Sequence, residues 1–384
     1  MELDLREWLP RNLSCSKLRR TRIPIGRGYE ITRFLGSLLI VCEVFEPRLS
    51  RIVGVQNLFA LVSELAMNQM TRRGFLMSSL SGSLIAMSSM TRGAEDATAE
   101  PIIDIHQHTN YRARTAEQLI AHQRTMGVTQ TILLPAGSSV KRPSTGDGKH
   151  NTLGGVGAGG NDTALTMARQ HSKEFFFGAN EVTDLPEARA EIAKYLDLGG
   201  IIIGEQKFAV ECDSAESQAL YALAAEYKVP ILMHFQHGTY NLGFERLHKM
   251  LEKFPKTNFI GHAQTWWANI DKNHSDQKVL YPKGKVTAGG LTDRYLADYP
   301  NMFADMSAGS GLNALTRDED HTRGFLDRHQ NKILYGSDCD DRVGAGPGCS
   351  GSQTIAAIRK LAPNKTAERK ILFENAKKLF RFNV

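Results

Sequence analysis

Two histidines near the start of a regular alternation of strands and helices are the first residues whose spacing suggests chemistry. His106 and His108 follow the apolar run PIIDI and are separated by one residue. Side chains at i and i+2 of a strand point to the same side, so both imidazoles are expected to face one point. Two neutral imidazoles that converge in this way are half of a metal site. Chance alternation in a strand also produces such a pair, so the rest of the chain decides its meaning.

Three later apolar runs also end in a residue that can bind a metal. The runs VPILMH, NFIGH and KILYGSD end in His234, His262 and Asp338. In isolation, His234 could be a core histidine bonded to a backbone carbonyl, and Asp338 could cap a helix. One pattern repeated four times, an apolar strand followed by a donor, favours a shared site at the carboxyl ends of parallel strands.

The elements that would position these donors can be read from residue 100 onward. Short apolar strands alternate there with amphipathic helices, which is typical of βα units and a parallel sheet. We predict an α/β fold, a (β/α)8 TIM barrel forming a single catalytic domain over residues 100–384. The expected strands are 102–105, 129–134, 175–179, 200–204, 231–234, 259–261, 302–306 and 332–336. The expected helices are 115–126, 163–171, 186–198, 215–227, 244–254, 291–299, 321–329, 352–361 and 366–380.

The donor motifs resemble those of a known group of enzymes. DIHQH, ILMHF, FIGHA, LYGSD and the closing ILFENAKKLF, in that order, are similar to the amidohydrolase superfamily and its amidohydrolase-related branch. That branch contains metal-dependent TIM-barrel hydrolases and decarboxylases. The resemblance covers residues 100 to the end of the chain, about the length of one such barrel.

The resemblance implies a metal centre and roles for its residues. His106, His108, His234 and Asp338 would hold one divalent metal, and His262 would lie beside it. Four nitrogen and oxygen donors suit Zn²⁺, with Mn²⁺ and Fe²⁺ as alternatives. Zinc lowers the pKa of bound water to about 7. Asp338 would take the proton of that water, and His262 would hydrogen-bond the water or the developing oxyanion, giving hydrolysis of an amide, ester or lactone.

Four further residues are candidates for substrate binding. In members of the superfamily with two metals, a carboxylated lysine or a glutamate after strand four bridges the ions. Lys207 and Glu205 are near that place in this chain. We nevertheless expect one metal, and we assign Lys207 to substrate binding. His237 lies past the end of the 231–234 strand, where it would face substrate or be simply exposed. Arg317, in a loop after strand seven, would suit a carboxylate. Trp266 could roof the pocket or pack against the barrel flank.

Two other functions stay open at this point. The same ligands serve non-oxidative decarboxylases in the resembling branch, so decarboxylation of a carboxylate-bearing substrate is the main alternative. A catalytically silent metal- or solute-binding barrel is the second. Release of CO₂, set against incorporation of oxygen from labelled water, would separate decarboxylation from hydrolysis.

The segment before the expected barrel looks like an export signal. TRRGFL, at residues 71–76, resembles a twin-arginine motif, and a weakly apolar stretch and the small residues ATA follow within 67–99. We expect the twin-arginine machinery to be a partner of the precursor and the product to be exported, to the periplasm in a Gram-negative cell. Residues 1–66 lack sustained periodicity and are interpreted as an over-extended start, with translation beginning at Met67 or Met70.

Charge and cysteine content narrow the remaining classes. The chain of 384 residues carries a net charge of +6, of which residues 1–66 contribute three and residues 67–99 one. The excess left for the barrel forms no basic stripe, so a nucleic-acid partner is excluded, while a small-molecule substrate is expected and a homo-oligomer is left open. Cys212, Cys339 and Cys349 are too few for a disulfide framework. Cys339 is expected to pack rather than ligate, because a strand neighbour of Asp338 points away from it.

Overall fold

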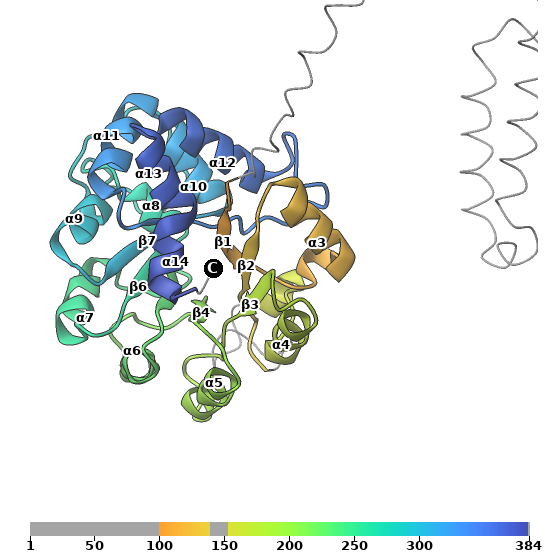
Figure 1. Cartoon of the computed structure of the whole chain (residues 1–384). Helices are drawn as coiled ribbons and strands as arrows, with labels where there is room; N and C mark the ends of the chain where they lie inside the picture. Colours follow the sequence, from red (N-terminus) through yellow and green to blue (C-terminus); the bar gives the residue numbers. More distant parts are fainter. Residues whose placement is uncertain (1–99, 139–152, 383–384) are drawn as a thin grey trace, which may run out of the picture. The chain divides into compact units, whose positions relative to one another are not determined.

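Eight parallel strands form the centre of the computed structural model, which describes residues 100–138 and 153–382 (Figure 1). The doubtful extension 1–66, the export signal 67–99 and most of the glycine-rich loop after the second strand lie outside the described residues. All described residues belong to one compact unit, 94–384. The strands are β1 (Ile103–Gln107), β2 (Gln130–Leu133), β3 (Phe175–Phe177), β4 (Ile203–Gln206), β5 (Ile231–His234), β6 (Phe259–His262), β7 (Met302–Met306) and β8 (Ile333–Tyr335).

Each strand pairs with its neighbours in sequence order. Strands β1–β2–β3 form one sheet and β4–β5–β6–β7–β8 form another, and all pairs are parallel. A bridge between Ala179 and Ile203 joins the two sheets. The last strand returns to the first, because the Asp338 amide donates to the carbonyl of His106 at 2.8 Å. The predicted (β/α)8 barrel is therefore confirmed.

Helices surround the strands and connect them. They are α3 (Ala116–Thr125), α4 (Asn161–Gln170), α5 (Ala188–Asp197), α6 (Ala215–Tyr227), α7 (Leu247–Lys253), α8 (Gln264–Ala268), α9 (Leu291–Asp298), α10 (Ala308–Thr316), α11 (Glu319–His329), α12 (Ser350–Leu361), α13 (Lys365–Arg369) and α14 (Asn375–Phe380). The sequence pattern does not predict α8 or α10. The segment that forms α10, AGSGLNALT, contains glycine and serine, which are poor helix formers, so local propensity did not reveal it. Among the described residues, no helix is long and apolar enough to cross a membrane.

The barrel interior and the outer layer have separate apolar cores. Ile103 and Ile105 pack inside the barrel with residues such as Leu232 and Ile260. Phe380, the last residue of α14, and Phe382, two residues after it, belong to the same interior cluster, and α14 crosses the barrel in Figure 1. The second core fills the space between the strands and the surrounding helices.

An irregularity in β1 aims the histidine pair. The register between β1 and β2 shifts between Asp104 and Gln107. Simple alternation from Ile103 and Ile105, which face the interior, would point His106 outward. The shift puts His106 back on the interior side, and His108 follows it two residues later.

Candidate metal centre

Four histidine rings converge where β1, β5 and β6 end. His106 lies in β1, His108 directly follows it, and His234 and His262 end β5 and β6. The ring centroid of His106 lies 5.1 Å from that of His108 and 4.6 Å from that of His262, and the His234 ring lies 5.2 Å from the His262 ring. All four side chains are buried. The carboxyl ends of barrel strands thus bring together histidines that are far apart in the sequence.

Glu205, at the end of β4, lies between these rings. Its Oε2 is 3.4 Å from Nε2 of both His106 and His108. Its Oε1 is 2.5 Å from Nδ1 of His234 and 3.6 Å from Nε2 of His262. The sequence analysis noted Glu205 only as one of two residues near a bridging position and left it out of the ligand set. Its place directly after an apolar strand, like that of the other donors, was the available signal.

Asp338, which follows β8 near the end of the chain, is the last of the residues grouped at this centre. Its Oδ1 lies 3.4 Å from Nε2 of His108, and its Oδ2 lies 3.7 Å from Nε2 of His262. The backbone at Asp338 has a φ of 39°, a left-handed conformation that costs a non-glycine residue energy and recurs at functional sites. The side chain is 11% exposed, whereas that of Glu205 is 1% exposed. Of these two carboxylates, Asp338 is therefore the one that solvent or a substrate reaches.

Hydrogen bonds behind three of the rings fix their proton positions. Nδ1 of His106 lies 2.6 Å from Oδ2 of Asp305, and Nδ1 of His108 lies 2.6 Å from the carbonyl of Leu134. Nδ1 of His262 lies 3.0 Å from the hydroxyl of Ser307, which itself donates to Asp305. A carbonyl and a carboxylate can only accept, so each of these rings carries a proton on Nδ1 and turns its Nε2 to the centre.

The donors fit a cation. Oε2 of Glu205 and Oδ1 of Asp338 are buried and have no hydrogen-bond partner among the described residues. Buried carboxylate oxygens are costly when unpaired. Two sets of donors that share Glu205 each lie within 4.8 Å of one another: His106, His108 and Glu205; and Glu205, His234 and His262. Nitrogen and oxygen donors in this number suit a divalent metal.

Charges in the centre are strongly coupled. Burial disfavours charge on His106, but Asp338, Asp305 and Glu205 outweigh it and hold the pKa of His106 well above its usual value, so binding of a metal at its Nε2 would release a proton. Burial likewise opposes ionisation of Glu205, but His234 and His106 hold its pKa well below the ordinary range. For His234, burial and then Lys207 lower the pKa to about 4. A neutral His234 and ionised carboxylates are the forms in which these residues bind metals.

Two tyrosines and a lysine border the centre. Tyr111 lies edge-on to His108 with ring centroids 5.1 Å apart, and Tyr240 lies edge-on to His234 at 5.5 Å. Nζ of Lys207 lies 5.7 Å from the centroid of Tyr240. Lys207 thus lies near the donors, and its assignment to the substrate stays a prediction. Neither tyrosine is marked by its spacing in the sequence, because Tyr111 opens a short 3-10 helix and Tyr240 lies in the irregular segment after β5.

The structure separates the other expected substrate contacts. His237 is exposed in the loop after β5. Trp266 is fully buried between Phe235 and Phe244, which is the packing position that the sequence left as its alternative. Arg317 follows the C-terminal end of α10, and nine helical residues, roughly 13 Å of helix, separate it from Ser307 at the centre. The Trp266 ring is therefore part of the core, whereas the substrate role of Arg317 stays a prediction.

Comparisons with known proteins agree with this fold. An amidohydrolase family model matches residues 103–382. No curated protein matches the chain significantly. A TIM-barrel protein of unknown function from Bordetella bronchiseptica superposes with a TM-score of 0.50 and 15% identity, over 73% of this chain and 98% of that one. At this identity the match shows the fold alone.

Two enzymes are among the other similar structures. One is a 2,6-dihydroxybenzoate decarboxylase from Rhizobium, with 12% identity and a TM-score of 0.45, over 73% of this chain and 99% of that one. The second is a probable 2-pyrone-4,6-dicarboxylic acid hydrolase from Acinetobacter baumannii, with 12% identity and a TM-score of 0.47, over 73% and 99%. Because the family model spans the whole barrel from β1 to the end of α14, the chain belongs to the amidohydrolase family of enzymes.

Proposed function

We propose that this enzyme is a metal-dependent hydrolase that cleaves an amide, ester or lactone bond of a small molecule. The observation that carries the proposal is the position of Asp338. Its carboxylate is partly exposed at the barrel mouth and faces the Nε2 atoms of His108 and His262. Burial opposes its ionisation, but His106 and His108 hold its pKa below the ordinary range. An ionised, accessible carboxylate at this point is suited to accept a proton from water.

The proposed metal is zinc, held by His106, His108, His234 and Asp338, and we add Glu205 to this set. The sequence favours one ion. Glu205, however, faces His106 and His108 with one oxygen and His234 and His262 with the other, so the centre has donors for two ions. When bound, the ion supplies a hydroxide nucleophile from water near neutral pH and polarises the substrate carbonyl.

The residues of the chain then divide the remaining work. Asp338 takes the proton of the attacking water and delivers it to the leaving group. His262, whose Nδ1 is held by Ser307 and Asp305, presents an unprotonated Nε2 that can accept a hydrogen bond from that water. Lys207 lies beside His234 and Tyr240, where its ammonium group would offset negative charge on the substrate.

The experiment follows oxygen and carbon separately. The full chain is incubated with a panel of lactones, aryl esters and amides in water labelled with heavy oxygen, and the products are analysed by mass spectrometry. Metal content is measured in the same samples. The Asp338→Asn variant is compared with Asp340→Asn, a matched change two residues along the same loop at a carboxylate that is 41% exposed and paired with Arg112.

Hydrolysis predicts heavy oxygen in the product and a loss of at least about a hundredfold in rate for Asp338→Asn when excess metal is supplied. The Asp340→Asn variant should keep most of the rate. Release of CO₂ without labelled product would replace this proposal by decarboxylation. Stoichiometric metal without turnover of any substrate, with Asp338 dispensable, would leave a binding barrel.

We also propose that the precursor is exported through the twin-arginine route to the periplasm. The motif at residues 71–76 supports this destination. The full chain and an Arg72→Lys/Arg73→Lys variant would be followed by cell fractionation in a Gram-negative host. Equal cytoplasmic retention of both proteins would contradict export by this route.

A further inference from the structure

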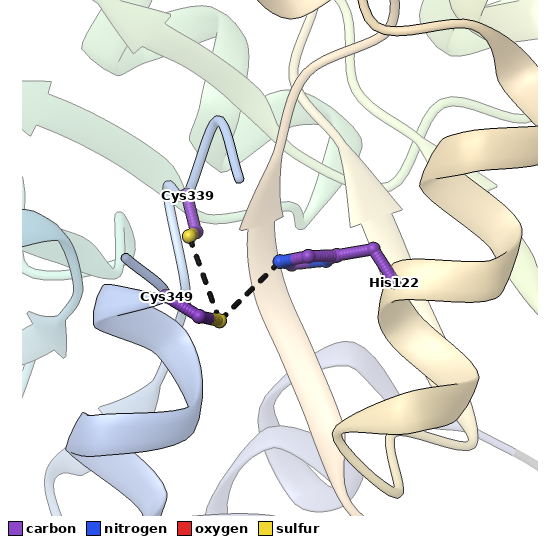
Figure 2. Close-up of side chains that lie close together, drawn as sticks. All are labelled: His122, Cys339 and Cys349. Atoms are coloured by element: carbon purple, nitrogen blue, oxygen red, sulfur yellow. Dashed lines mark hydrogen bonds between the residues drawn. The ribbon is translucent and has the colours of Figure 1, made fainter. Parts of the chain in front are cut away.

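A second group of metal-binding side chains lies apart from the histidine centre. It consists of His122 in α3, Met126 at the end of that helix, Cys339 after β8 and Cys349 at the start of α12. His122 and Cys349 are fully buried, and Cys339 and Met126 are 2% and 7% exposed. Figure 2 shows both sulfur atoms and the His122 ring pointing toward one another from different elements. The sequence analysis expected Cys339 to pack only.

The spacing of these atoms matches one coordination shell. Sγ of Cys349 lies 3.7 Å from Sγ of Cys339, 3.5 Å from Nε2 of His122 and 3.6 Å from Sδ of Met126. A tetrahedral ion with bonds of about 2.3 Å to sulfur and 2.0 Å to nitrogen separates two sulfurs by about 3.8 Å, and sulfur from nitrogen by about 3.5 Å. The three distances from Cys349 therefore match one coordination shell, and one ring nitrogen of His122 and the two thiols all lie within 4.8 Å of one another.

The orientation of His122 is fixed by its neighbours. Nε2 of the Gln123 amide donates to Asp104 at 2.8 Å and to Thr131 at 2.8 Å, so the amide oxygen of Gln123 is the atom that faces His122. That oxygen lies 3.1 Å from Nδ1 of His122 and can only accept. His122 consequently carries its proton on Nδ1 and turns an unprotonated Nε2 toward the sulfurs, which is the arrangement found at metal-binding histidines.

Cys349 also contacts the backbone at the start of α12. Its Sγ caps α12 and accepts the backbone N–H of Ser352 at 3.3 Å. A metal-bound thiolate can keep this hydrogen bond, because its sulfur remains an acceptor. This contact adds to the geometry of the three other donors.

We propose that His122, Cys339, Cys349 and Met126 form a second metal site, for a closed-shell thiophilic ion. Binding releases one proton from each thiol to solvent and forms two metal–sulfur bonds. Two thiolates with Zn²⁺ leave no net charge, which favours Zn²⁺ in a buried site, whereas the thioether of Met126 also suits Cu⁺. The ion would be structural, because all four positions are taken by side chains.

The site would support the first centre through the loop that they share. Cys339 directly follows Asp338, and its carbonyl accepts hydrogen bonds from Nε2 of Gln107 and from Arg114, both at 2.8 Å. Gln107 lies between His106 and His108. An ion bound by Cys339 would therefore hold the loop of Asp338 against β1, and Asp338 would be positioned by residues on both sides.

The experiment measures metal–sulfur bonds directly. The full chain is loaded with Zn²⁺, and its X-ray absorption spectrum is compared with those of Cys339→Ser/Cys349→Ser and of Cys212→Ser. Cys212 is the matched control, since it is equally buried but donates its thiol to the carbonyl of Gly243 away from this group. Nitrogen and oxygen donors form the histidine centre, so a sulfur shell reports on the second site alone.

We expect a sulfur shell at about 2.3 Å in the wild type and in Cys212→Ser. The double variant should lose this shell and bind about one ion per chain fewer than the wild type. Anaerobic titration with Cu⁺ in place of Zn²⁺ shows which ion is held more tightly. If the double variant does not fold, the wild-type spectrum still decides, because it needs no variant. Absence of a sulfur shell in the wild type, or a Cys339–Cys349 disulfide in the freshly isolated chain, would overturn the proposal.

Discussion

Nδ1 of His106 lies 2.6 Å from Oδ2 of Asp305, which is 199 residues further along the chain. The contact fixes the proton of the ring on Nδ1 and leaves Nε2 facing Glu205 and Asp338. Asp305 also accepts from Ser307, and one of its oxygens lies 3.2 Å from Nδ1 of His262. One buried carboxylate on β7 thus orients two histidines that come from β1 and β6.

Replacing Asp305 by Asn should weaken metal binding without removing a ligand. The amide keeps the size of the side chain but cannot accept from His106, Ser307 and His262 as a carboxylate does. Loss of such a supporting partner typically lowers metal affinity about ten- to a hundredfold. Competition with a chelator would measure the change. Asp327→Asn, at an exposed position of α11, is the control, and equal affinities in the two variants would refute the role of Asp305.

The Glu205→Gln variant tests the carboxylate at the centre of the site. Because Glu205 contacts all four histidines, we expect this change to remove at least one ion per chain. Metal content by mass spectrometry, beside the exposed Glu226→Gln as a control, gives the answer. Unchanged metal content in Glu205→Gln would show that the carboxylate only orients His234.

Gly336 is required by the close packing of three strands. A Cβ atom at this position would lie 2.3 Å from Oδ1 of Asp305 and 2.9 Å from Cβ of His106. Gly336→Ala should therefore cost about 1–3 kcal/mol in the free energy of unfolding and lower metal affinity as well. Gly309→Ala is the matched variant, since its Cβ would meet only the Tyr281 ring, at 3.8 Å, and alanine favours the helix. Chemical denaturation should show a lower free energy of unfolding for Gly336→Ala and no such decrease for Gly309→Ala.

Asp293 should make stability depend on pH. It lies 2.5 Å from Nε2 of His329 and 2.9 Å from Arg328. Burial opposes its ionisation, but His329, the amide of Gly289 and Arg328 hold its pKa below the usual value. Because the pKa is lower in the folded than in the unfolded chain, the stabilisation is complete above about pH 5 and is lost as the pH falls below about 4.

We expect Asp293→Asn to lower the free energy of unfolding by about 1–3 kcal/mol at pH 7. The difference from wild type should shrink as denaturation is repeated toward pH 3. Asp298→Asn, at an exposed position of the same helix, should show neither effect. A difference that stays constant with pH would mean that the carboxylate charge is not responsible.

Much of the barrel could be predicted because its strands are short apolar runs with polar ends. His106, His108, His234, His262 and Asp338 each follow such a run, and the parallel order of the strands brings these positions together. The strand ends carry donors because side chains there leave the packed interior. The change from apolar to polar residues that identifies each strand in the sequence therefore also identifies the residues at the barrel mouth.

Other parts of the centre depend on contacts between distant segments. Asp305 stands inside the strand MFADM, where nothing local distinguishes an orienting carboxylate from a solvated one. Trp266 sits in a loop-like stretch, yet its ring covers Gly261, whose missing side chain gives it room. The grouping of His122 with Cys339 and Cys349 joins residues more than two hundred positions apart. Such pairings follow from the closed barrel rather than from any single element.

The contact between β1 and the segment after β8 also determines when the donors can come together during synthesis. His106 and His108 leave the ribosome about 230 residues before Asp338, an interval of roughly ten to fifty seconds at ordinary rates of translation. Until the last strand emerges, the nascent chain offers histidines without the carboxylate that completes them. A metal held by these residues would therefore be selected at the end of synthesis, after the chain has closed on itself.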